Sequence, residues 1–155
     1  MARRRAATDE SGASEPSAVL VVGTDDWGIQ QAVDHLEGAG IPTRTCHPFG
    51  EPSFPCNALV EGRTCPLDAG FDLVVTIRAR PDALPAPGEL GVICALHAHV
   101  GLITAGIAGR NPFAPWARRA VGRADDLAAV VHDVLRERTT TAVDLRSSAA
   151  VGGES

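Results

Sequence analysis

The chain has 155 residues, 45% of them hydrophobic, so it can bury the core of one domain without disulfides or a structural metal. Its net charge of -5 argues against a nucleic-acid surface, which needs clustered basic residues. All 14 basic residues are arginine, which excludes P-loop ATPases, protein kinases and enzymes that hold pyridoxal phosphate on a lysine. A serine hydrolase is unsupported, because Ser53 is the only serine between Ala18 and Arg138 and lies in no G-x-S-x-G motif.

The ends of the chain carry few residues that could join a core. Residues 1–17 and 139–155 are predicted to be disordered tails around one domain at 18–138. No apolar run reaches the roughly 20 residues that span a bilayer, and no apolar stretch follows the first arginines as in a signal peptide. We therefore expect a cytoplasmic protein without membrane contact, and the lysine-free composition indicates a bacterium with a GC-rich genome.

The first half of the domain begins with an apolar run. Residues 18–23, AVLVVG, are typical of a strand buried on both faces of a parallel sheet. Asp25 or Asp26 can cap the helix that follows, which the glycines of EGAG end. A second strand, PTRTC, is predicted at 42–46, and the Pro-, Gly- and Cys-rich segment 47–70 is predicted to be an unusually long irregular loop.

The second half alternates strands and helices. A strand at 71–79 leads through a proline-rich turn to a helix with Leu90, Ile93 and Leu96, and VGLITAG gives the next strand. NPFAPW is predicted to be a loop that packs on the sheet edge, with partner docking as the alternative. RAVGR is predicted to be a short edge strand, and the last helix is amphipathic from Leu127 to Leu135. The pattern predicts an α/β fold, a three-layer, doubly wound parallel sheet of flavodoxin-like order 2-1-3-4-5.

Three segments, AVLVVGTDDWGIQQAVDHLEGAG, FDLVVTIRARPD and VGLITAG, resemble the first, third and fourth strand regions of response-regulator receiver domains. The resemblance implies an acidic pair for magnesium, a phosphoacceptor aspartate after the third strand, a Thr or Ser after the fourth and a lysine after the fifth. Thr104 fits its position, but Thr76, Ile77 or Arg78 stands where the aspartate is expected, and no lysine exists. The chain therefore resembles a degenerate receiver domain that cannot be phosphorylated in the usual way.

The carboxyl ends of the strands are where doubly wound sheets bind ligands. The GTDDWG turn is interpreted either as a ligand- or magnesium-binding turn or, more simply, as helix capping. The candidate ligand-binding residues at this edge are Gly23, Thr24, Asp25, Asp26, Arg78 and Thr104.

Three cysteines lie on the loop 47–70 or at its start. Cys46, Cys56 and Cys65, with His47, are candidate ligands for zinc or an iron–sulfur cluster, although the paired C-x₂₋₄-C spacing of structural zinc sites is missing. A reversible disulfide between Cys56 and Cys65 and ordinary unreactive thiols are the alternatives. Cys94 is predicted to be a small core residue of the helix.

Three functions remain open. The first is a non-enzymatic regulatory or ligand-binding module with a degenerate receiver-like fold, whose cysteine loop replaces the usual second helix. The second is a metal-binding protein, thiol-redox sensor or small oxidoreductase that uses the cysteines, with zinc or an iron–sulfur cluster as cofactor. The third is a scaffold that docks protein partners.

Overall fold

The computed structural model describes residues 18–60, 62–81, 84–106 and 111–150, except the side chains at 57, 124 and 142–150. Its five strands form one parallel sheet of order β2-β1-β3-β4-β5. The strands are β1 (Val19–Gly23), β2 (Thr43–Thr45), β3 (Leu73–Arg78), β4 (Gly101–Gly106) and β5 (Arg119–Val121). The predicted flavodoxin-like α/β fold and strand order are confirmed.

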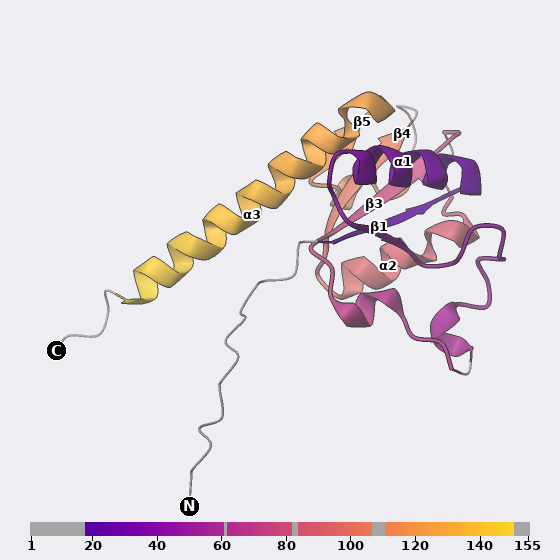
Figure 1. The fold of residues 1–155 in the computed structure, drawn as a ribbon, viewed down its shortest axis with the longest axis horizontal. Helices are drawn as coiled ribbons and strands as arrows, with labels where there is room; N and C mark the ends of the chain where they lie inside the picture. The colour runs from indigo at the N-terminus through magenta and orange to yellow at the C-terminus, as the bar shows by residue number, and fades with distance from the viewer. Residues whose placement is uncertain (1–17, 61, 82–83, 107–110, 151–155) are drawn as a thin grey trace, which may run out of the picture.

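Helices cover both faces of the sheet (Figure 1). They are α1 (Asp26–Gly38) and α3 (Leu127–Ala150) on one face and α2 (Leu90–His97) on the other. Alternate strand residues supply the two cores, because successive side chains of a strand point to opposite faces. Val19 and Val21 pack under α1 and α3, whereas Leu20 and Val22 pack with Val92 of α2.

The helix ends follow local chemistry. Asp25 is the N-cap of α1, and its Oδ1 accepts a hydrogen bond of 2.8 Å from the backbone N–H of Gly28.

Within the part of the chain that the structure describes, no helix is both long enough and apolar enough to cross a bilayer.

The C-terminal helix is longer than predicted. Residues 139–150 belong to α3 and are not a disordered tail. The physical reason is that this segment contains no glycine or proline to end the helix, so the hydrogen-bonding pattern of α3 continues past its amphipathic part. The predicted tail at 1–17 and the last residues, 151–155, lie outside the described residues.

The predicted loop is irregular over its described residues. It contains two single-turn 3₁₀ helices, η1 (Asn57–Leu59) and η2 (Pro66–Ala69), and lies on the same side of the sheet as α2 (Figure 1). Leu67 and Phe71 pack against the core on that side. The loop therefore covers the part of this face that a helix between β2 and β3 would cover.

The segment after β4 closes the far edge of the same face. Phe113 is buried and packs with Leu102 and Val92, and its backbone N–H donates to Oδ1 of Asn111 at 2.9 Å. Trp116 lies in the short η4 turn (Ala114–Trp116) and is exposed. The prediction that this loop packs on the sheet edge is confirmed for Phe113 and is wrong for Trp116.

Candidate functional site

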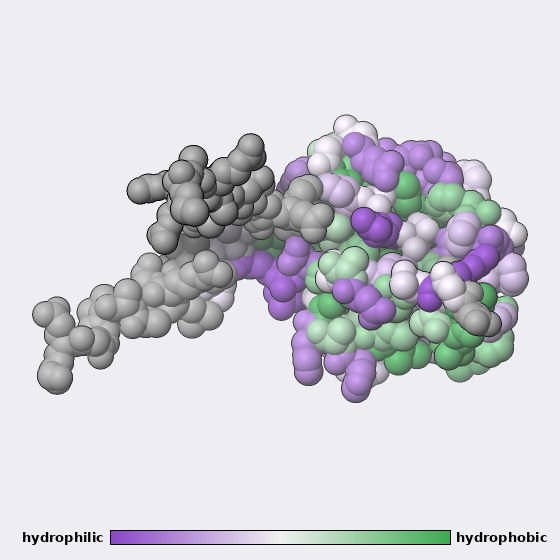
Figure 2. Space-filling model, turned by 60° about the horizontal axis from the view of Figure 1, so that its bottom comes forward, coloured by the Kyte–Doolittle hydropathy of each residue, from purple (hydrophilic) through white to green (hydrophobic). Residues whose placement is uncertain are grey.

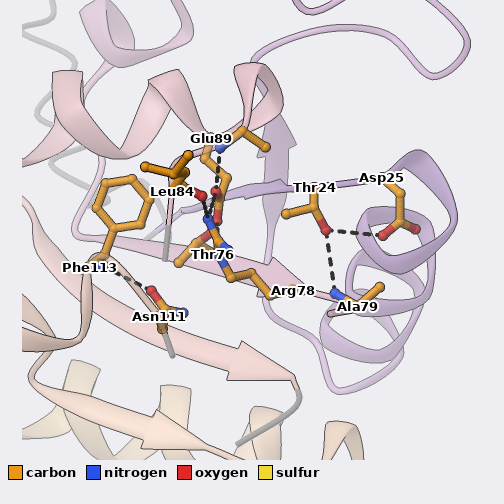
Figure 3. A network of polar contacts seen from close by, with 10 residues as sticks. Thr24, Asp25, Thr76, Arg78, Ala79, Leu84, Glu89, Asn111 and Phe113 are labelled. Carbon is orange, nitrogen blue, oxygen red and sulfur yellow. Dashed lines mark hydrogen bonds and ion pairs between the residues drawn. The ribbon is translucent and has the colours of Figure 1, made fainter. Parts of the chain in front are cut away.

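A buried ion pair occupies the carboxyl end of β3 (Figure 3). Arg78 Nε lies 2.9 Å from Glu89 Oε1, and Arg78 Nη2 lies 2.5 Å from Glu89 Oε2, so the guanidinium holds the carboxylate at both oxygens. The two side chains are 2% and 0% exposed. A bidentate pair of this kind is the geometry that best offsets the cost of burying two charges.

Further hydrogen bonds satisfy the pair. Thr76 Oγ1 donates to Glu89 Oε1 at 2.8 Å, the backbone N–H of Ala86 donates to Oε2 at 3.0 Å, and Arg78 Nη2 donates to the carbonyl of Leu84 at 2.7 Å. Thr76 and Arg78 alternate along β3 and so point to the same face, where Glu89 begins α2. Arg78 is therefore part of a structural network that joins β3 to α2.

The turn after β1 is engaged in local contacts. Thr24 Oγ1 lies 3.2 Å from Asp25 Oδ2 and accepts from the backbone N–H of Ala79 at 3.4 Å (Figure 3). Because Asp25 caps α1, the capping interpretation of GTDDWG is supported for this residue. A Cβ at Gly23 would lie 2.7 Å from the carbonyl oxygen of Ile77, so glycine permits the close packing of β1 on β3.

The six predicted ligand-binding residues do not form one site. Thr24, Asp25 and Arg78 line an open cavity of about 670 Å³ together with Arg80 and residues 84–86. Asp26 faces the cysteine loop instead, where its Oδ2 accepts from the backbone N–H of Gly50 at 2.9 Å.

Gly23 and Thr104 lie outside the residues that line this cavity. The carbonyl oxygen of Gly23 would be 2.2 Å from a Cβ at Gly88, so this backbone is covered by the turn before α2. Thr104 is 5% exposed and pairs with Thr76 in the register of β3 and β4. Both residues serve the packing of the sheet.

Cys46 follows β2 and is half-buried against α2. A Cβ added at Gly91 would lie 2.6 Å from Cys46 Sγ, so the thiol sits directly on the helix backbone at this glycine. The loop also contacts the turn before α2, because Ser53 Oγ lies 3.5 Å from the position of a Cβ added at Gly88. These two contacts place the start of the loop over the turn before α2 and the first residues of the helix.

Cys56 and Cys65 are half-buried and precede the two 3₁₀ turns of the loop. Glu51 and Arg63 form an ion pair of 2.8 Å that ties together the chain on either side of Cys56. Both partners are more than 40% exposed, so the pair fixes the shape of the loop with little gain in stability.

Cys94 is exposed on α2, so its predicted place in the core is wrong. The reason is the helix phase: Val92 and Ala95 take the buried positions, and Cys94 points outward three residues after Gly91. Residues three apart lie on the same side of a helix, which brings Cys94 toward the thiol that rests on Gly91.

Cys46 and Cys94 each lie within electrostatic reach of Cys56 and Cys65. The pKa of Cys46 is raised to about 12, chiefly by burial and then by the neighbouring charges of Cys65, Cys56 and Cys94 in that order. The pKa of Cys94 is raised by burial and then by the charges of Cys56 and Cys65. The loop and α2 thus bring all four cysteines of the chain to one side of the sheet.

His47 lies beside Cys46 in a small cleft with Asp26, Glu51 and Ser53. Its carbonyl accepts from Thr45 Oγ1 at 2.8 Å, which turns the chain as it leaves β2. Over residues 18–150, gaps excepted, no three His, Cys, Asp or Glu side chains are arranged to hold a metal ion. Any metal centre therefore requires the loop to bring its thiols closer together.

Comparison with known proteins adds no further information on the site: no protein-family model matches the chain, and no curated protein matches it significantly.

Two residues of the site were not predicted from the sequence. Glu89 stands in GEL at the start of a helix, where an acidic residue is usual at the surface, and nothing nearby marks it as buried. The exposure of Cys94 depends on which side of α2 faces the sheet. The sequence does not show this side, because the helix is short and almost wholly apolar.

Proposed function

We propose that this chain is a non-enzymatic regulatory module that holds a soft metal centre, zinc or an iron–sulfur cluster, on Cys46, Cys56, Cys65 and Cys94. One observation carries the proposal: the cysteines come from the end of β2, from two points of the loop and from α2, and they gather on one face. Four thiolates are the usual ligand set of both kinds of centre.

The raised pKa values of Cys46 and Cys94 argue against these two thiols as redox nucleophiles. A reactive cysteine needs a lowered pKa, whereas the pKa values of Cys46 and Cys94 are raised. Neighbouring thiolates repel one another unless a cation lies between them, and metal binding then contributes its free energy to ordering the loop. Closure would move Cys56 and Cys65 toward Cys46, which is fixed against α2.

The regulatory part of the proposal rests on the resemblance to receiver domains. At the end of β3, Arg78 and Glu89 form a neutral, fully bonded pair where those domains carry a phosphoacceptor. Asp25, at the acidic position, caps a helix. We infer that a signal enters this fold through the cysteines instead of through an acyl phosphate.

Hydrophobic residues surround the cysteines and offer a surface for the readout. Phe54, Leu59 and Ile93 are 66%, 74% and 50% exposed. Figure 2, in which the bottom of Figure 1 comes forward, shows hydrophobic residues spread between polar ones over this side. A change in the loop on metal binding or loss would rearrange this surface, which is the property required of a sensor that acts on a protein partner.

The test is purification of the full chain without oxygen, with zinc, iron and sulfide determined and the visible spectrum recorded. We expect either one zinc per chain without colour, or several irons with an equal amount of sulfide and the visible colour of an iron–sulfur cluster. Serine at any one of the four cysteines should reduce metal content at least severalfold, whereas Leu59→Ala, in the same loop, should not. Absence of stoichiometric metal after reconstitution with both metals would overturn the proposal.

The same preparation distinguishes the redox alternative. If the metal-free chain treated with peroxide loses two thiols and gains a disulfide between Cys56 and Cys65, and if that bond is reversed by a dithiol, the loop is a redox switch. The Cys94→Ser variant separates the two functions, because it should impair a metal centre and leave such a disulfide intact.

A further inference from the structure

A second cavity lies on the opposite side of the sheet from the cysteines. It has a volume of about 310 Å³ and lies between α1, the carboxyl ends of β3 and β4, and the start of α3. Its lining is mostly apolar, with Trp27, Ile77, Ala105 and Leu127 among the residues that form it. The volume is at the lower end of the range for small-molecule sites.

His35 is the unusual residue of this lining. Its Nε2 is buried and has no hydrogen-bond partner among the described residues. A buried polar group without a partner is costly, and native proteins rarely leave one unless a water or ligand satisfies it. His35 stands on α1 one turn after Gln31, which in turn follows Trp27 by one turn, so a single stripe of the helix presents these three side chains to the cavity.

The charges around the cavity favour a neutral ligand. Arg78 also contributes to the lining, but its guanidinium is engaged by the carboxylate of Glu89 and by the carbonyl of Leu84. Gln31 and His35 are the polar side chains of the lining that remain. Trp27 is 70% exposed and offers a flat apolar surface against which a ring can stack.

We propose that this cavity binds a small, neutral aromatic molecule with one hydroxyl or N–H group, which forms a hydrogen bond with Nε2 of His35. The apolar lining holds the ring, and the imidazole selects the polar group. This site is independent of the metal centre, because it lies on the α1 and α3 side of the sheet and shares no residue with the cysteine loop.

Phenol and toluene are the probes, because they differ by one hydroxyl group. Binding to the full chain is followed by backbone amide NMR shifts at Gly28, Gly106 and Gly122, which line the cavity. The Trp116→Phe background leaves Trp27 as the only tryptophan, so fluorescence quenching gives a second readout. We expect phenol to bind at least tenfold more tightly than toluene, with shifts confined to the cavity.

Two variants decide the outcome. His35→Leu should bring phenol down to the affinity of toluene while toluene binds as before. Gly122→Leu should block both probes, because a Cβ at Gly122 meets no atom within 4 Å and a side chain can enter the cavity without a clash. Equal binding of the two probes to the wild-type chain would overturn the proposal. So would phenol binding that His35→Leu leaves unchanged. If His35→Leu does not fold, phenol binding that Gly122→Leu leaves unchanged would overturn it instead.

Discussion

The face of the sheet under α1 and α3 is covered by two regular helices, whereas the opposite face is covered by one short helix and a long loop. On the first face, apolar side chains at helical spacing, such as Leu36 and Val131, fill the core. On the second, an apolar core that includes Leu20 and Leu102 is joined by a buried ion pair, close glycine contacts and half-buried thiols. Both faces have a buried apolar core, but only the second also carries buried charges and half-buried thiols, so the two faces differ in chemistry more than in packing.

The largest expected effect is on the buried ion pair of the second face. Glu89→Gln leaves the charge of Arg78 buried without its counter-ion, and we expect a loss of roughly 3–5 kcal/mol in the free energy of unfolding by urea denaturation. Replacing both partners by leucine should cost less than the single change. A loss below about 1 kcal/mol for Glu89→Gln would mean that the pair does not anchor α2.

Leucine truncations compare the two faces directly. Leu127 is fully buried on the first face, and Leu67 of the loop is partly buried on the second. We expect Leu127→Ala to cost about 3 kcal/mol and Leu67→Ala about 1 kcal/mol, because a cavity costs more where the surroundings cannot collapse. Equal costs in urea denaturation would show that the loop is as tightly packed as the helices.

The reactivity of the thiols tests how firmly the loop covers its face. With a pKa raised to about 12, Cys46 is almost wholly protonated at pH 8. We expect iodoacetamide to modify it about a hundredfold more slowly than a peptide cysteine, and its rate to rise about tenfold per pH unit as thiolate forms. Mass spectrometry of the metal-free chain measures each site. If iodoacetamide modified Cys46 as fast as a peptide cysteine, the thiol would be exposed to solvent and not buried against α2.

A substitution at Gly91 tests the contact between the cysteine loop and α2. Gly91→Ala puts a Cβ 2.6 Å from Cys46 Sγ, so we expect a loss of about 1 kcal/mol even though alanine favours helices. Adding Cys46→Ala should recover part of it. Gly38→Ala at the end of α1 is the matched control, since its Cβ meets nothing within 4 Å and should not destabilise the chain. A gain in stability from Gly91→Ala would contradict the contact.

The smallest effect is expected at the surface of the loop. Glu51→Gln removes the exposed pair with Arg63, and the free energy of unfolding should change by less than about 0.5 kcal/mol. Since Arg63 contacts a carboxylate across the loop, amide exchange between residues 50 and 60 is the more sensitive measurement. A larger change in unfolding would show that the loop folds together with the sheet.

The strands and the α3 side of the sheet were predictable, because AVLVVG is a continuous apolar run and Leu127–Leu135 has helical periodicity. The strand order followed from the alternation of strands and helices. The second face was predicted less well, since the roles of Glu89 and Cys94 depend on contacts between distant segments. Arg78 was placed at the right strand end, but its partner Glu89 is the N-cap of α2, eleven residues further along the chain, and no local pattern marks it.

The close approach of backbones around α2 has a consequence for recognising relatives of this chain. A Cβ at Gly88 would lie 2.2 Å from the oxygen of Gly23, and one at Gly91 would meet Cys46, so neither position tolerates a side chain without movement of the backbone or the thiol. Related sequences should therefore keep the signature G-E-x-G with an arginine eleven residues before its glutamate, even where overall identity has been lost.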